Sequence, residues 1–243
     1  MMNGKSVSRT RGRVAWLAVV ALAAALGCTA SASATVSVKT GFFFGHDLRQ
    51  AQSVVYVLDL SGSMSEASGS VVEQAGTTVA AKAVGGLIGG SVGRAAESRI
   101  EKMKKKIEKV KLHLIASLQG LPPGSTFNII MFSDGVQKLA PGMIQANAAT
   151  KTLVSAFVDR LEEGGSTNMY KALEAAVYMP TKEIILLTDG EPTSSTPEEI
   201  LDLLRRKNQG RFIVSTVGVG NDHAREFLEQ IAAENGGTYT AYD

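Results

Sequence analysis

The stretch SVVYVLDLSGS, at residues 53–63, combines a run of apolar side chains with a polar ending. Residues 53–58 do not alternate cleanly between apolar and polar positions, which is typical of a strand buried on both faces in a parallel sheet. Asp59 and a turn that contains Gly62 follow this run. The stretch therefore predicts a central parallel strand whose carboxyl end carries polar side chains.

Further apolar runs occur downstream, and the segments between them have a helical pattern. The runs are residues 126–132, 183–188, 211–217 and a weaker one at 238–242. The helical segments are residues 100–114, 148–161 and 169–178, one that starts at Thr196-Pro197, and one capped by Asp222 and closed by Gly236. This alternation predicts an α/β fold, with a doubly wound, mostly parallel sheet and helices on both faces. Ligands of such sheets bind at the carboxyl ends of the strands, where the strand order reverses.

Lysines gather in the first of these helices, around an apolar stripe that includes Ile107, Val110 and Leu114. The lysines are Lys102, Lys104, Lys105, Lys106, Lys109 and Lys111. A basic partner site is one interpretation of this stretch. A solvated helix face is the simpler interpretation, and we predict it here.

Three oxygen-bearing side chains follow the first strand at alternate positions. Asp59, Ser61 and Ser63 point the same way in extended backbone, because alternate residues share a face. Carboxylate and hydroxyl oxygens are the ligands of hard cations such as Mg²⁺, Mn²⁺ and Ca²⁺. Taken alone, the pattern also fits an ordinary turn rich in serine and glycine.

Two other loops add oxygen ligands. Thr167 lies in the loop at residues 164–168, and Asp189 follows the run at residues 183–188. In a doubly wound sheet these loops meet Asp59 at the switch point. We therefore expect one divalent cation held by Asp59, Ser61, Ser63, Thr167 and Asp189. The alternative is that these residues only cap helices and shape turns.

From about residue 53 to residue 242, the sequence resembles the von Willebrand factor A family. Asp59-Leu60-Ser61-Gly62-Ser63 matches the D-x-S-x-S motif of that family, Thr167 stands at its separate threonine, and Asp189 at the aspartate after its fourth strand. Residues 122–124, 127–130 and 132–133 also look like its second-strand region. The resemblance implies a six-stranded, mostly parallel sheet and a von Willebrand factor A domain over residues 53–243.

The same resemblance implies a metal-ion-dependent adhesion site. Ser61, Ser63 and Thr167 would be direct or near-direct ligands, and Asp59 and Asp189 would bind directly or through water. The family leaves one position for water or for an acidic residue of a protein partner. It follows as an expectation that the chain is a non-catalytic domain for protein recognition or adhesion, with Mg²⁺, or else Mn²⁺ or Ca²⁺, as its cation.

The amino-terminal residues have the pattern of a secretory signal peptide. A basic start with Lys5, Arg9, Arg11 and Arg13 precedes an apolar run at residues 14–26 and the small residues Ala32-Ser33-Ala34. We predict a signal peptide at residues 1–34, a lead-in at residues 35–52, and an extracytoplasmic protein in the bacterial periplasm, on the cell surface or secreted. Cys28, the single cysteine, offers a lipoprotein site as a less favoured alternative, and only in that case is membrane attachment expected.

The charge balance argues against nucleic acid as a partner. Four of the 25 basic residues and none of the 23 acidic residues lie in the leader, so the remainder has a formal net charge of −2. A nearly neutral domain provides no electrostatic reason to bind a polyanion.

A segment rich in glycine, alanine, serine and valine, at residues 65–96, interrupts the alternation of strands and helices. It is longer than an ordinary connection, departs from the family pattern and lies next to the predicted site. We interpret it as a flexible or partly helical insertion. Gly85, Gly89 and Gly93 lie four residues apart, which suits close pairing of helices. An alternative function follows, in which the cation is only structural and this insertion drives self-association.

A serine hydrolase is the enzymatic alternative. Ser91 lies in a G-x-S-x-G pattern, and Asp189 and His223 follow in the order of that class. The motif needs a strand directly before the serine, and residues 83–88 form a poor one because glycines interrupt them. We therefore predict no enzyme. Whether Phe42-Phe43-Phe44 belongs to the core or to an interface stays open at this point.

Overall fold

The computed structural model describes residues 38–66, 105–221 and 223–242 of the chain. The predicted signal peptide, Cys28, Ser91 and the predicted insertion beyond Glu66 lie outside the described residues. In the described part, no helix reaches the length and apolar character needed to cross a bilayer.

The centre of the fold is a sheet of five parallel strands. They are β3 (Ser53–Asp59), β4 (Thr126–Phe132), β7 (Glu183–Thr188), β8 (Ile213–Val219) and β9 (Gly236–Tyr242). The short strands β5 (Val136–Lys138) and β6 (Ile144–Gln145) pair with β4 in the antiparallel sense. The strand order is β5-β4-β3-β7-β8-β9, which confirms the predicted doubly wound, mostly parallel sheet.

The strand order reverses at β3. This strand pairs with β4 on one side and with β7 on the other, so the chain returns across it after β4 has formed. Leu58 lies opposite Leu187 in that register, which places the ends of β3 and β7 next to each other. The switch point of the sheet therefore lies between Asp59 and Thr188.

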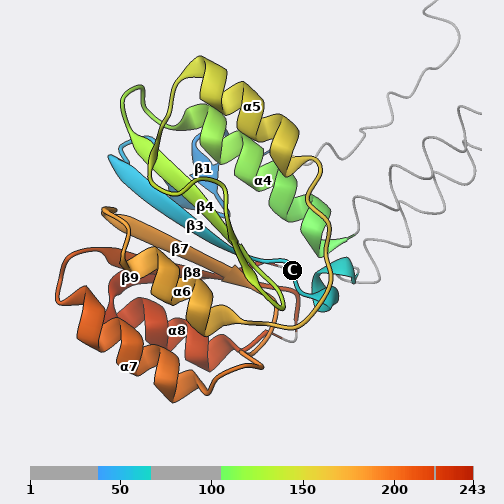
Figure 1. Cartoon of the computed structure of the whole chain (residues 1–243), viewed down its shortest axis with the longest axis vertical. Coiled ribbons are helices and arrows are strands. Elements are labelled where there is room, and N and C mark those ends of the chain that lie inside the picture. The colour runs from blue at the N-terminus through green and yellow to red at the C-terminus, as the bar shows by residue number, and fades with distance from the viewer. Residues whose placement is uncertain (1–37, 67–104, 222, 243) are drawn as a thin grey trace, which may run out of the picture. The chain divides into compact units, whose positions relative to one another are not determined.

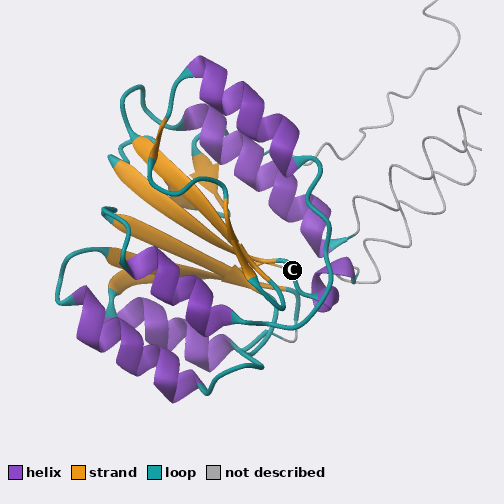
Figure 2. Ribbon diagram, viewed as in Figure 1, coloured by secondary structure: helices purple, strands orange, loops and turns teal. Residues whose placement is uncertain are grey.

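Helices cover both faces of the sheet (Figures 1 and 2). One face carries α4 (Lys106–Gly120) and α5 (Ala148–Val158), and near them lies the hairpin of β1 (Phe42–Phe43) and β2 (His46–Asp47). The other face carries α6 (Met169–Val177), α7 (Pro197–Asn208) and α8 (Arg225–Glu234). The described residues thus form a three-layered α/β domain.

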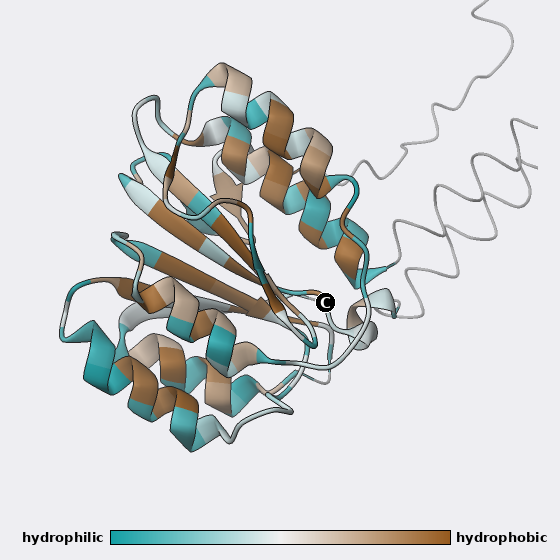
Figure 3. Ribbon diagram, in the orientation of Figure 1, coloured by the Kyte–Doolittle hydropathy of each residue, from teal (hydrophilic) through white to brown (hydrophobic). Residues whose placement is uncertain are grey.

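Alternate residues of β3 supply the two hydrophobic cores. Val54, Tyr56 and Leu58 pack with α4 and α5, whereas Val55 and Val57 pack with α6, α7 and α8. The central strands are accordingly mostly hydrophobic in Figure 3, and the helices mix hydrophobic and hydrophilic residues. All seven residues of β3 are buried, as expected for a strand covered on both faces.

The structure bears on three of the expectations from the sequence. Of the phenylalanine triple, Phe43 and Phe44 are 0% and 2% exposed and belong to the core, whereas Phe42 is half-buried. The predicted start of α7 is confirmed, because Thr196 and Glu199 form a reciprocal capping box. The predicted cap of the last helix is wrong: α8 is preceded by Ala224, since its first turn begins at Arg225, after Asp222.

The two ends of the undescribed internal segment meet. The backbone N–H of Lys106 donates to the backbone carbonyl of Glu66, at a nitrogen–oxygen distance of 3.0 Å. Glu66 follows a short 3-10 helix, η1 (Gly62–Ser65), and Lys106 begins α4. The chain therefore leaves and re-enters the described fold beside the carboxyl end of β3.

Candidate metal site

Asp59, the last residue of β3, is fully buried at the switch point. Its side chain has no solvent exposure, and both oxygens accept hydrogen bonds. The backbone N–H of Ser61 donates to Oδ1 at 2.8 Å, and the hydroxyl of Thr188 donates to Oδ2 at 2.5 Å. The carboxylate is therefore fixed from its own loop and from the end of β7.

A row of hydrogen-bonded oxygens leads from this loop to the end of β7. The hydroxyl oxygens of Ser61 and Ser63 lie 3.0 Å apart, and the hydroxyl of Ser63 donates to Asp189 Oδ1 at 2.7 Å. Ser61 and Asp189 are each 3% exposed. The structure thus brings together four of the five predicted ligands.

Thr167, the fifth predicted ligand, lies in a loop that packs against the loop after β3. The N–H of Gly62 donates to the carbonyl of Gly165 at 3.1 Å, and the N–H of Gly164 donates to the carbonyl of Leu60 at 2.8 Å. Thr167 itself is 7% exposed. Its N–H donates to the hydroxyl of Thr193, which follows Asp189 in the next loop. The backbone N–H of Thr193 in turn donates to the carbonyl of Thr167 at 3.2 Å, so hydrogen bonds join the three predicted loops.

Asp134 holds the Thr167 loop in place. Its Oδ1 accepts the N–H of Ser166 at 2.7 Å. Hydrogen bonding by the side chain and then the backbone of Ser166 lowers the pKa of this carboxyl. Gly165 has a φ of +87°, and an added Cβ there would lie 2.6 Å from Asp134 Oδ2. Glycine at this position permits both the left-handed backbone and the close approach of the carboxylate.

Lys106 completes the site with a positive charge. Its Nζ lies 2.8 Å from Asp189 Oδ2 and 3.9 Å from Glu66 Oε2, and its side chain is only 3% exposed. The prediction of a solvated lysine face is therefore wrong for Lys106, and also for Lys111, which is 8% exposed. Lys102 and Lys104 lie outside the described residues.

Burial also acts on the protonation of Asp59. Loss of solvent raises the pKa of its carboxyl, and the nearby charge of Asp189 raises it further. The hydrogen bonds from Ser61 and Thr188 act in the opposite direction. Two carboxylates held together out of water favour the arrival of positive charge.

Three residues of this arrangement were not predicted: Lys106, Asp134 and Thr188. Lys106 shares a helix face with Val110 and Leu114, four and eight residues on, and this spacing was a signal of its burial. Thr188 directly precedes Asp189 at a strand end. The sequence holds no comparable signal for Asp134.

The donor set suits a hard cation. Among the described residues, no group of three or more histidine, cysteine, aspartate or glutamate side chains is placed to hold a metal. The candidate site has two carboxylates instead, and serine and threonine hydroxyls supply its remaining oxygens. All are hard oxygen donors of the kind that Mg²⁺, Mn²⁺ and Ca²⁺ use. The ammonium of Lys106 shows that Asp189 accommodates positive charge, so the residues fit a cation.

The hydrolase alternative finds no support in the geometry of Asp189 and His223. Asp189 contacts Ser63 and Lys106. His223 uses Nε2 with the hydroxyl of Tyr239, at 2.5 Å, and Nδ1 with the carbonyl of Gly220. Each group thus has partners other than the triad that this alternative requires.

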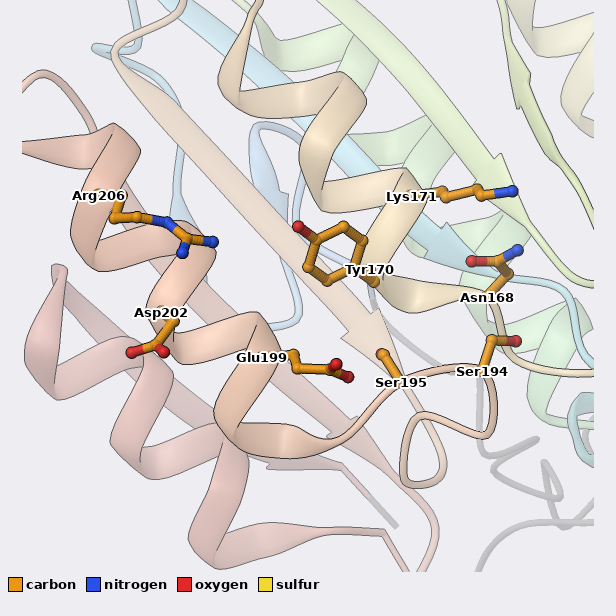
Figure 4. Close-up of a pocket in the computed structure, with 8 residues that line it drawn as sticks. All are labelled: Asn168, Tyr170, Lys171, Ser194, Ser195, Glu199, Asp202 and Arg206. Atoms are coloured by element: carbon orange, nitrogen blue, oxygen red, sulfur yellow. The ribbon is translucent and has the colours of Figure 1, made fainter.

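Two hollows open near the site. One, of about 480 Å³, lies between α6 and α7 and includes Tyr170, Glu199 and Arg206 (Figure 4). Ser195 is on the loop before α7, and its buried hydroxyl has no hydrogen-bond partner within the described part of the chain. The other hollow, of about 270 Å³, runs from Leu60 to the partly exposed Phe157. Both hollows adjoin the loops of the site, because the first includes Asn168 and the second includes Leu60.

Comparisons with known proteins point to one family. Residues 98–241 match the sequence profile of the von Willebrand factor type A domain. Among curated proteins, inter-alpha-trypsin inhibitor heavy chain H4 of Homo sapiens is 31% identical over 148 residues, which are 55% of this chain and 16% of the relative. Heavy chain H1 of Sus scrofa is 30% identical with the same coverage. The chain therefore spans about a sixth of the length of these relatives.

Solved structures show the same fold. The von Willebrand factor type A protein of Catenulispora acidiphila has a TM-score of 0.58 at 21% identity, covering 79% of this chain and 39% of that one. An aerotolerance-related membrane protein of Bacteroides fragilis has a TM-score of 0.52 at 16% identity, with coverages of 79% and 91%. At such identities the likeness concerns the fold alone.

Proposed function

Because the chain belongs to the von Willebrand factor type A domain family, we propose that it binds one divalent cation and recognises a protein partner through it. The observation that carries this proposal is the chain of hydrogen bonds from Asp59 through Ser61 and Ser63 to Asp189 at the switch point, in which the backbone N–H of Ser61 makes the first link. Thr167 lies on the adjoining loop and is the fifth ligand. The preferred cation is Mg²⁺, with Mn²⁺ and Ca²⁺ as alternatives.

The residues of the site divide into ligands and supports. Asp59 and Asp189 supply negative charge, and the hydroxyls of Ser61, Ser63 and Thr167 supply neutral oxygens. Ser63 donates its hydrogen to Asp189 and accepts the hydrogen of Ser61, which leaves one lone pair of its oxygen for a cation. Thr188 and Asp134 orient these groups from outside.

A cation that is held by only two carboxylates stays electrophilic, and it can bind one more anionic ligand. An aspartate or glutamate side chain of a protein partner has the required charge and hard oxygens. The hollow between Leu60 and Phe157 lies beside the site and provides surface for neighbouring side chains of that partner. Because a leader is predicted at residues 1–34, we expect this recognition to take place outside the cytoplasm.

Calorimetric titration of the full-length chain with Mg²⁺ and Mn²⁺ tests the cation site. We expect one ion per chain, and at least about tenfold weaker binding by Ser63→Ala and Asp189→Ala. Ser65→Ala is the matched control, because Ser65 lies in the same short helix and its hydroxyl donates to the carbonyl of Gly62. A folded chain that binds no cation contradicts the proposal.

Water proton relaxation in the Mn²⁺-loaded protein then separates recognition from a purely structural cation. Recognition requires an exchangeable water on the ion, and a short peptide with one aspartate should displace it and lower the relaxation enhancement. The same peptide with asparagine is the control. A structural cation would give no response to either peptide. Sedimentation velocity tests the accompanying alternative, self-association through residues 65–96, which predicts a dimer or larger species.

A further inference from the structure

Lys106 is the unexpected member of the site. It is the first residue of α4, and its ammonium reaches Asp189 Oδ2 across 2.8 Å while the side chain stays 97% covered. The other oxygen of that carboxylate accepts the hydroxyl of Ser63. The ammonium therefore contacts the same carboxylate that the proposed function assigns to the cation.

The position of Lys106 on its helix is electrostatically unfavourable by itself. The first turn of a helix carries partial positive charge and favours acidic residues. Burial adds a second cost, because a lysine ammonium that leaves water needs a compensating charge. Asp189, whose side chain is fully buried, provides that charge, with the more distant Glu66 as a second acidic neighbour. The carboxylates of Asp189 and Glu66 thus offset the cost of placing an ammonium at this helix start.

We propose that Lys106 is a built-in counter-cation, which neutralises Asp189 in the metal-free protein and must leave it when a divalent cation binds. This inference rests on the proposed function. A divalent ion at Asp189 would bring two positive charges close to the ammonium, and at short range such repulsion is large in a site removed from water. Lys106 has a long, flexible side chain and can withdraw toward the exposed carboxylate of Glu66, which is 64% exposed.

Two consequences follow from this competition. The site stays assembled without metal, because Asp189 never lacks a positive partner. The affinity for a divalent cation is also lower than the oxygen ligands alone would give, because part of the binding free energy displaces Lys106. The site therefore fills only at a higher concentration of the free ion.

The inference is tested with Lys106→Met in the full-length chain, beside Lys105→Met as the matched control. Lys105 is the preceding residue and pairs with Glu163, away from Asp189. We expect Lys106→Met to bind Mn²⁺ about tenfold more tightly than the parent in calorimetric titration, and to melt at a lower temperature in chelator. Lys105→Met should change neither quantity. Lys106→Arg, which retains the charge, should keep the stability of the parent in chelator.

A second measurement needs no variant. In the parent, acylation of individual lysines by an amine-reactive ester is followed by mass spectrometry with and without saturating Mn²⁺. Lys106 should be protected in chelator and become reactive with Mn²⁺, whereas the half-exposed Lys105 should react equally in both. Unchanged labelling of Lys106 in the Mn²⁺-loaded protein overturns the inference.

The outcomes separate this inference from the proposed function. If parent and Lys106→Met bind Mn²⁺ equally well, the competition is wrong and the cation site stands. If neither folded protein binds Mn²⁺, the proposed function is wrong and the inference falls with it.

Discussion

Thr188 donates its hydroxyl hydrogen to Asp59, with 2.5 Å between Oγ1 and Oδ2, at the place where β7 and β3 end side by side. Both residues are 0% exposed, so no solvent can replace this donor. The Thr188→Val variant should therefore lower the free energy of unfolding in chelator by about 1–3 kcal/mol. Urea denaturation measures this loss. Thr188→Ser keeps the hydroxyl and should lose much less; equal losses in the two variants would contradict the assigned role.

Asp134 offers a test of the Thr167 loop. Its carboxylate accepts the N–H of Ser166, one residue before the proposed ligand. Asp134→Ala should weaken Mg²⁺ binding about tenfold, because outer partners that orient ligands commonly contribute that much. Titration calorimetry provides the comparison. Glu162→Ala removes another exposed carboxylate from the neighbouring loop and should leave the affinity unchanged.

Gly165 should tolerate no side chain. Alanine there would adopt a φ of +87° and bring its Cβ within 2.6 Å of Asp134 Oδ2. We expect Gly165→Ala to lower the free energy of unfolding by about 1–3 kcal/mol. Gly135→Ala is the control, since an added Cβ there meets no atom within 4 Å. Similar urea midpoints for the two variants would show that the loop rearranges freely.

Glu183, at the amino end of β7, should make stability depend on pH. Burial raises the pKa of this carboxyl from 4.5 to about 7. Between these values the folded state binds more protons than the unfolded state, so stability falls as pH rises through the window. Above about pH 7 the carboxyl is ionised in both states. Its burial then lowers the free energy of unfolding by an amount on the order of 1–3 kcal/mol, because the group keeps some exposure.

The Glu183→Gln variant removes this dependence. It should match the parent near pH 4.5 and exceed its melting temperature at pH 8, where the parent holds a buried charge. Glu226→Gln, at an exposed position of α8, should follow the parent at both values. A parent whose stability rises between pH 5 and 7 by an amount that Glu183→Gln abolishes would reverse the sign and contradict the argument.

The apolar pattern was sufficient to predict most of the fold. The structure has β4 and β7 with the predicted bounds, because their runs have polar or turn residues at both ends. The predicted strand at 211–217 begins later, at Ile213, since residues before it complete the end of α7. Asn208 accepts the N–H of Arg211 with its carbonyl and the N–H of Phe212 with its side chain. Such local hydrogen bonds delay the start of the strand, and the apolar pattern of the sequence does not reveal them.

The candidate site was likewise predicted only in part. Asp59, Ser61, Ser63, Thr167 and Asp189 stand in recognisable motifs, and the structure places their loops together. The position of Lys106 depends on Asp189, which lies 83 residues further along the chain. From its charge alone, we predicted that this side chain would be exposed to solvent. The three-dimensional structure is needed to show that the carboxylate of Asp189 takes the place of solvent around the ammonium.

The backbone hydrogen bond between Lys106 and Glu66 has a consequence for the length of the chain between them. The entropy lost in closing a flexible loop grows with the logarithm of its length, at about 0.6 kcal/mol for each doubling. Because the two ends are already joined at the fold, residues 67–104 can lengthen or shorten at little cost to the domain. Natural variation can therefore change the length of this segment while the fold that carries the proposed cation site stays the same.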